Sequence, residues 1–147
     1  MRYLHEAEKA KITRELSEAH GLDEEIGLYL NQINSIDGIC TTKSCTGHCG
    51  VDADGVWRIP GFLNLRLTAD MARLFEVFAF SLVGEPEVTH LSKEYWPWGE
   101  EEIAIGFKGA GHGDDQLERS MLKITAFFRQ LACLNTTEQP LQEELSL

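Results

Sequence analysis

The sequence predicts a single α+β domain in which helices cover a mostly antiparallel sheet. Its 147 residues are a usual length for one domain and are enough to bury a core. Hydrophobic residues make up 43% of the chain and charged residues 25%, as is typical of a folded globular protein. Helical and alternating patterns follow one another in the order α-α-β-β-α-β-β-α, so strands that are neighbours in the chain can pair antiparallel.

Two helices are expected at the start of the chain. Residues 1–20 are rich in Glu, Lys, Arg and Ala, and their thin apolar stripe predicts an N-terminal helix that docks loosely. The stripe consists of Leu4, Ile12 and Leu16. A second helix is expected from Asp23, after Gly21, because its apolar residues keep the i, i+3, i+4, i+7 spacing of a helix. These residues are Ile26, Tyr29, Leu30 and Ile33.

Two strands are expected next. Residues 39–45, rich in Thr and Cys, predict a short strand, and residues 47–55 (GHCGVDADG) predict a loop because of their Gly and Asp content. Residues 56–67 predict a second strand with one buried face, because apolar and polar residues alternate along it. The alternating residues are Leu63, Asn64, Leu65, Arg66 and Leu67. The dipeptide Pro60-Gly61 is expected to bend this strand or to mark a bulge or an edge.

A helix and a hairpin are expected in the second half of the chain. Thr68 is expected to cap the helix with the strongest apolar stripe in the sequence. That stripe consists of Met71, Leu74, Phe75, Phe78, Ala79 and Leu82. Residues 86–107 contain two alternating segments and predict a hairpin. Its tip carries Tyr95, Trp96 and Trp98, and the acidic run Glu100–Glu102 is interpreted as a solvated strand start.

A final helix completes the expected domain, which spans residues 1–134. Asp114 or Asp115 is expected to cap this helix. Its apolar residues are Leu117, Met121, Ile124, Phe128 and Leu131. Residues 135–147 are polar, contain Pro140 and are expected to form a mobile tail.

Charge and hydropathy exclude several functions. With 13 Lys and Arg against 24 Asp and Glu, the formal net charge is −11, which disfavours binding to bulk nucleic acid. No apolar run reaches the roughly 18 residues needed to span a bilayer, so no membrane association is expected. The start, MRYLHEAEKAK, lacks the apolar core of a secretory signal. We therefore expect a cytoplasmic location, in which thiols stay reduced. No pattern indicates the oligomeric state.

The stretch CTTKSCTGHCG, residues 40–50, holds three of the four cysteines. The ligands of a zinc site here would be Cys40, Cys45, His48 and Cys49, but the paired C-x2-C spacing of a zinc knuckle is missing, so zinc is not favoured. A reactive thiol would use Cys45 with His48 three residues on, oriented by Asp52 or Asp54. The third interpretation is that the cysteines are small buried residues on a strand.

Part of this stretch resembles a known motif. Thr41-Thr42-Lys43-Ser44-Cys45-Thr46-Gly47-His48 is similar to the T-T-S-S-C-S-G-R motif of the tRNA wybutosine-synthesizing protein 3 family, in which it also lies on a strand after an amphipathic helix. Pro60-Gly61-Phe62-Leu63 and the helix from Thr68 are similar in order to the next elements of that family. The resemblance covers residues 26–83. Residues 106–111 (GFKGAG) also resemble the G-F-R-x-S-G element of the family, but they follow a hairpin and lack its serine.

The resemblance implies a shared fold and an activity that uses S-adenosylmethionine to methylate a tRNA base. His48 replaces the arginine of the motif, and Lys43 and Thr46 replace serines. Together with the acidic composition, these changes favour a small-molecule or nucleotide ligand. The expected ligand-binding residues are Thr42, Lys43, Ser44, Cys45, Thr46, Gly47 and His48. The alternative is a non-enzymatic metal-binding or protein-interaction module that uses the same Cys/His cluster.

A glycine-rich loop, GAGHGDD at residues 109–115, adds to the expected site. Such a loop before a helix can hold a phosphate with backbone N–H groups, although two aspartates here would repel it. The expected ligand-binding residues of the loop are Gly109, Gly111 and His112.

Because successive side chains of a strand point to opposite faces, we also expect Ser44, Thr46 and His48 to point outward and Cys45 inward.

Overall fold

The computed structural model describes residues 3–18, 26–95, 100–113 and 115–145. The helices in these ranges are α1 (Glu6–Glu18), α2 (Gly27–Asn34), α3 (Ala69–Val83), the short 3-10 turn η1 (Ala110–His112) and α4 (Gln116–Leu145). The strands are β1 (Ile39–Cys45), β2 (His48–Asp52), β3 (Gly55–Ile59), β4 (Gly61–Leu67), β5 (Val88–Tyr95) and β6 (Glu101–Phe107). The α+β class is confirmed; β2 is an addition to the expected order, and the strand expected over residues 56–67 is divided into β3 and β4.

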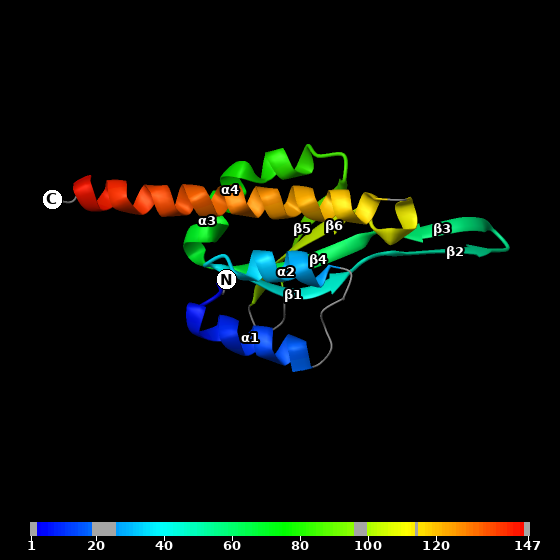
Figure 1. The fold of residues 1–147 in the computed structure, drawn as a ribbon, viewed down its shortest axis with the longest axis horizontal. Coiled ribbons are helices and arrows are strands. Elements are labelled where there is room, and N and C mark those ends of the chain that lie inside the picture. Colours follow the sequence, from blue (N-terminus) through cyan, green and yellow to red (C-terminus); the bar gives the residue numbers. More distant parts are fainter. Residues whose placement is uncertain (1–2, 19–25, 96–99, 114, 146–147) are drawn as a thin grey trace.

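The main sheet has four strands in the order β1-β4-β6-β5, and all neighbouring pairs are antiparallel. Figure 1 shows α2, α3 and α4 over one face of this sheet. The side chains that join the two layers are Ile39, Leu63, Leu65, Ile103, Ile105 and Phe107 of the sheet and Leu30, Met71, Phe75, Met121, Ile124 and Phe128 of the helices. Each apolar side chain of this size stabilises the fold by about 1.5–3 kcal/mol when fully buried. The predicted apolar stripes therefore form the core.

The helix α1 lies on the opposite face of the sheet, beside β1 (Figure 1). The Glu6 carboxylate accepts a hydrogen bond of 2.8 Å from the N–H of Gly38, and Lys9 Nζ donates one of 2.6 Å to the carbonyl of Ile36. Leu4 is 3% exposed, and its N–H donates to the Leu67 carbonyl at 2.9 Å. The docking of α1 is therefore largely polar, which an apolar stripe does not reveal.

The prediction of a loop over residues 47–55 is wrong. β2 and β3 form an antiparallel hairpin in which Val51 lies opposite Val56. The turn is short, and in it Asp52 Oδ1 accepts a hydrogen bond of 2.8 Å from the N–H of Asp54. Figure 1 shows the hairpin projecting beyond the end of the main sheet. Val51 is 80% and Val56 67% exposed, so the strands lack the buried face that would indicate them in a sequence.

The strand expected over residues 56–67 is interrupted at Pro60, because β3 pairs with β2 before it and β4 pairs with β1 and β6 after it. The prediction that β4 buries only one face is wrong: Asn64 is 4% and Arg66 2% exposed. The interpretation of the acidic run as solvated is also wrong for Glu102, which is 5% exposed. These three polar side chains lie on the face of the sheet that is turned away from α2, α3 and α4, here called the open face.

Some expectations concern residues outside the described ranges. Residues 96–99 of the expected aromatic tip, Asp23 at the expected start of α2, and Asp114 are among them. Asp115 precedes α4 with a φ of 63°. The helix α4 continues to Leu145, beyond the expected domain boundary, and the mobility of the tail stays a prediction. No helix in the described part of the chain combines the length and apolar composition needed to cross a membrane.

Candidate functional site

Residues 40–50 form most of β1, a tight turn and the start of β2. Gly47 lies in the turn with a φ of +95°, a left-handed conformation that favours glycine. A Cβ at this position would also lie 2.9 Å from the carbonyl oxygen of Ile59. At this turn the chain stops pairing with β4 and begins to pair with β3. Only glycine meets both requirements of the turn.

The turn brings Cys45 and His48 together. Cys45 Sγ and His48 Nε2 are 3.4 Å apart, within hydrogen-bonding distance for sulfur. Cys45 lies directly opposite Phe62 of β4 and is half-buried, and His48 is exposed, as expected. Asp52, expected to orient the imidazole, instead accepts the hydrogen bond within the hairpin turn. The predicted pair of thiol and imidazole therefore exists, without the predicted carboxylate.

The predicted orientation of the other motif side chains is wrong. Thr46 is 8% exposed, and Ser44 lies opposite the fully buried Leu63 with its Oγ enclosed. Cys45, expected to face the core, shares the open face with Phe62. The cause is a register shift in β1 between Thr41 and Lys43, because a shift of one residue exchanges the two faces of a strand.

Three segments far apart in the sequence meet at this end of the sheet. The motif at the end of β1 lies beside the start of β4, where Phe62 pairs with Cys45 on one side and Gly106 of β6 on the other. The glycine-rich loop that follows β6 reaches the motif as well, since the N–H of Ala110 donates a hydrogen bond of 2.9 Å to the carbonyl of Thr46. The two groups of residues expected to form one ligand site are therefore neighbours.

Close packing accounts for the glycines of this loop. A Cβ at Gly109 would overlap the carbonyl oxygen of Thr46, and one at Gly111 would lie 2.8 Å from Cys49 Cβ. His112 Nδ1 is enclosed and has no hydrogen-bond partner among the described residues. The glycines thus have a packing role, and their contact with a ligand stays a prediction.

A pocket of about 400 Å³ lies on the open face next to the motif. It is lined by Lys43, Ile59, Pro60, Gly61, Phe62, Asn64, His90, Glu94 and Ala104. Its polar floor is fixed, because Asn64 Nδ2 donates to Glu94 Oε2 at 3.0 Å and to Glu102 Oε2 at 3.1 Å. The pocket therefore offers an aromatic ring, an imidazole, an amide and groups of both charges. Of the predicted ligand-binding residues, Lys43 lines it.

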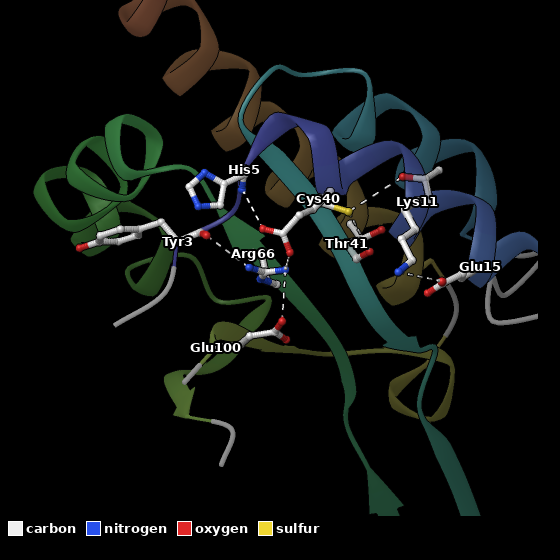
Figure 2. A network of polar contacts seen from close by, with 10 residues as sticks. Tyr3, His5, Lys11, Glu15, Cys40, Thr41, Arg66 and Glu100 are labelled. Atoms are coloured by element: carbon white, nitrogen blue, oxygen red, sulfur yellow. Dashed lines mark hydrogen bonds and ion pairs between the residues drawn. The ribbon is translucent and has the colours of Figure 1, made fainter. Parts of the chain in front are cut away.

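A second pocket, of about 460 Å³, lies between α1 and the open face. It is lined by Glu8, Lys11, Ile12, Glu15, Thr42, Arg66, Glu100 and Glu102. Figure 2 shows Arg66 held between Glu100 and the N-terminal segment. Its guanidinium pairs with Glu8 at 3.3 Å and Glu100 at 3.8 Å, and it donates to the carbonyl of Tyr3 at 3.3 Å. Arg66 Nε and Thr42 Oγ1 are enclosed without a hydrogen-bond partner in the described part of the structure.

Sequence reasoning missed Asn64, Arg66 and Glu102 as parts of these pockets. Alternation correctly placed Asn64 and Arg66 on the face away from the leucines, but it suggested that this face was solvated. Their partners are distant in the chain: Glu102 is 38 residues from Asn64, and Glu8 is 58 residues from Arg66. The sequence feature that could have indicated these buried polar groups is an arginine in one strand together with acidic residues in the strand that follows.

The four residues proposed as zinc ligands do not form one cluster, although Cys45 and His48 are neighbours. Cys40 is fully buried beneath α1, where its Sγ lies 3.9 Å from Thr13 Oγ1. Burial raises the pKa of the Cys40 thiol, and the Thr13 hydrogen bond opposes this shift. Within the described ranges, no group of three or more His, Cys, Asp or Glu side chains could hold a metal ion. The structure therefore lends no support to a metal centre.

Comparisons with known proteins provide information on the fold. No protein-family model matches the sequence. No curated protein matches it either. The chain is similar to the solved structure of the PH1069 protein from Pyrococcus horikoshii, with a TM-score of 0.51 and 15% sequence identity. The match covers 88% of this chain and 95% of that protein. At this identity the likeness shows a common fold and nothing about activity.

Proposed function

We propose that this chain binds S-adenosylmethionine, or a nucleotide related to it, in the 400 Å³ pocket of the open face. The proposal extends the resemblance to the tRNA wybutosine-synthesizing protein 3 family. One observation carries it: the three segments of that resemblance, separated in the sequence, converge at the same end of the sheet. They are the motif before His48, the start of β4 at Pro60–Phe62, and the turn after β6.

The lining of the pocket suits such a ligand. Its volume of about 400 Å³ falls within the range of roughly 300–1,000 Å³ for small-molecule sites. The ring of Phe62 offers a surface for an adenine ring, and Glu94 offers a carboxylate for ribose hydroxyls or a positive sulfonium. Lys43 would hold the carboxylate of the methionine part. When bound, S-adenosylmethionine supplies a methyl group on a positively charged sulfur.

The acidic composition favours a small second substrate over a whole tRNA. A net charge of −11 repels a polyphosphate backbone, whereas a nucleoside or a single nucleotide carries little charge. His90 lines the pocket and is exposed, so it is available to take up a proton from such a substrate. The proposed class is therefore a methyltransferase-like domain for a small nucleotide or nucleoside.

Calorimetric titration tests the proposal. S-adenosylmethionine, S-adenosylhomocysteine and adenosine are titrated into the wild type and into Lys43→Ala and Lys123→Ala. We expect Lys43→Ala to weaken binding by about tenfold, since it removes a charge-assisted contact worth about 1.4 kcal/mol or more. Lys123 lies on α4 and pairs with Glu85, so Lys123→Ala is the matched control. A titration at about 1 mM detects a binding free energy of only about 4 kcal/mol. If none of the three compounds binds at that concentration, the proposal is refuted.

A further inference from the structure

We propose that Cys45 and His48 form a thiol–imidazole pair that makes Cys45 the most nucleophilic thiol of this protein, a site of covalent modification by small electrophiles. The inference rests on the 3.4 Å between Cys45 Sγ and His48 Nε2. It does not depend on the binding of S-adenosylmethionine.

The turn between the two residues is rigidly held. The carbonyl of Thr46 accepts the hydrogen bond from Ala110, and Gly47 packs against the backbone of β3 and β4. His48 is itself fixed in register, opposite Ile59 of the hairpin. A base fixed at hydrogen-bonding distance from a nucleophile contributes more to reactivity than one that samples many positions. The pair is therefore preorganised by the fold.

The pair is also accessible, in contrast to Cys40. Cys45 is half-buried at the edge of the open face beside Phe62, and His48 is exposed. Cys40 is 0% exposed, and burial raises the pKa of its thiol. Cys49 is exposed on β2, and no imidazole lies within hydrogen-bonding distance of it in the described part of the chain. Cys49 is thus a natural internal control, because it is more exposed than Cys45 but lacks the base.

The reaction follows from the geometry. With Nε2 unprotonated, His48 accepts the proton of the Cys45 thiol, and the sulfur attacks an electrophilic carbon. A carbon–sulfur bond forms, the leaving group departs with the electrons of its bond to that carbon, and the imidazolium returns the proton to water. The net charge of −11 disfavours anionic reagents, so the class of electrophile is neutral or cationic, such as an alkyl halide.

The test measures the alkylation rate of each cysteine in one sample. The full chain is treated with iodoacetamide near neutral pH in the presence of a chelator, and peptide mass spectrometry follows all four cysteines with time. A positioned general base contributes about 10²- to 10⁴-fold to a proton transfer. Because no carboxylate of the described residues orients His48, we expect a smaller effect, with Cys45 about tenfold faster than Cys49. Equal rates at the two sites would overturn the proposal without any variant.

Two variants test the role of His48. His48→Gln keeps a hydrogen-bonding side chain but removes the base, and it should bring the rate at Cys45 to within about twofold of that at Cys49. His5→Gln is the matched control, since His5 is an exposed histidine just before α1. Its neighbour Leu4 bonds to Leu67, at the other end of β4 from Phe62. Unchanged rates at Cys49 and Cys40 would show that the variants keep the fold. An unchanged rate at Cys45 in His48→Gln would refute the pair.

Discussion

Gly109 lies where the loop after β6 touches the motif, and here the chain has no room for a side chain. A Cβ would overlap the carbonyl oxygen of Thr46, the same oxygen that accepts the hydrogen bond from Ala110. Because both atoms involved belong to the backbone, the overlap cannot be relieved by a change of rotamer. The distance between the two halves of the candidate site is therefore set at this one residue.

Gly109→Ala should lower the free energy of unfolding by about 1–3 kcal/mol, the usual cost of forcing extra atoms into a packed region. Gly27→Ala is the matched control, because no atom lies within 4 Å of the position of a Cβ at Gly27. The unfolding free energies of both variants are measured from the midpoints of denaturant unfolding, with m-values checked to be constant. Equal stability of the two variants would mean that η1 does not pack against the motif as described.

Burial of Cys40 predicts how the free energy of unfolding changes with pH. Burial raises the pKa of its thiol above the usual value of 9.0, and the Thr13 hydrogen bond acts in the opposite direction. Above pH 9, the unfolded chain releases this proton while the folded chain keeps it, so the contribution of Cys40 to stability is complete at neutral pH and declines as the pH rises. The difference in unfolding free energy between the wild type and Cys40→Ala should therefore shrink from pH 8 to about pH 10. A difference that stays constant would mean that the thiol is not desolvated.

At the scale of elements, α1 is attached to the sheet by contacts between charged groups, whereas the other helices are attached by apolar packing. Arg66 is 2% exposed, so its charge is held in a poorly hydrated site by Glu8 from α1 and by Glu100, the residue before β6. A buried charge that loses a partner costs about 3–5 kcal/mol. Since the Glu8 side chain is 24% exposed, solvent reduces this cost. The contact nevertheless links α1 to the floor of the larger pocket.

Glu8→Gln should lower the free energy of unfolding by about 2 kcal/mol and speed amide hydrogen exchange in α1. Glu15→Gln is the control: Glu15 pairs with Lys11 at 4.0 Å, and both side chains are at least 60% exposed, so the change should cost less than about 0.5 kcal/mol. Exchange rates in α1 are followed by mass spectrometry. Equal protection of α1 in the two variants would show that Arg66 does not anchor the helix.

The same elements show what a sequence can reveal. The stripe from Met71 to Leu82 predicted α3 because a helix with one buried face repeats its apolar positions over several turns. The strand β2 left no such trace, because side chains such as Val51 are exposed. The orientation of the motif was wrong because a register shift in β1 depends on how β4 pairs with it, which no local pattern records. The proximity of Thr46 and Ala110 likewise depends on how the strands are arranged in the sheet, so no local pattern predicts it.

At the scale of the whole molecule, the basic residues are largely occupied. Arg66 is buried, and ion pairs on the described surface involve Lys93 with Glu76 at 2.7 Å, Lys123 with Glu85 at 3.3 Å, Arg73 with Asp70 at 3.3 Å and Lys11 with Glu15 at 4.0 Å. With 24 acidic residues against 13 basic ones, the molecule has few positive charges left for a phosphate backbone.

We therefore predict no measurable binding of bulk tRNA at physiological salt. Binding of a nucleic acid gains most of its affinity from counterions released as cations approach phosphates, with a salt slope of about −0.9 for each phosphate neutralised on a duplex. A protein with a net charge of −11 gains little from this release, so lowering the salt to about 50 mM should not produce binding either. Fluorescence anisotropy of labelled tRNA measures both conditions. Sub-micromolar binding with a steep salt slope would require several surface lysines and arginines to act together, and single changes such as Arg58→Ala, on the projecting hairpin, would then reduce the slope by about one unit.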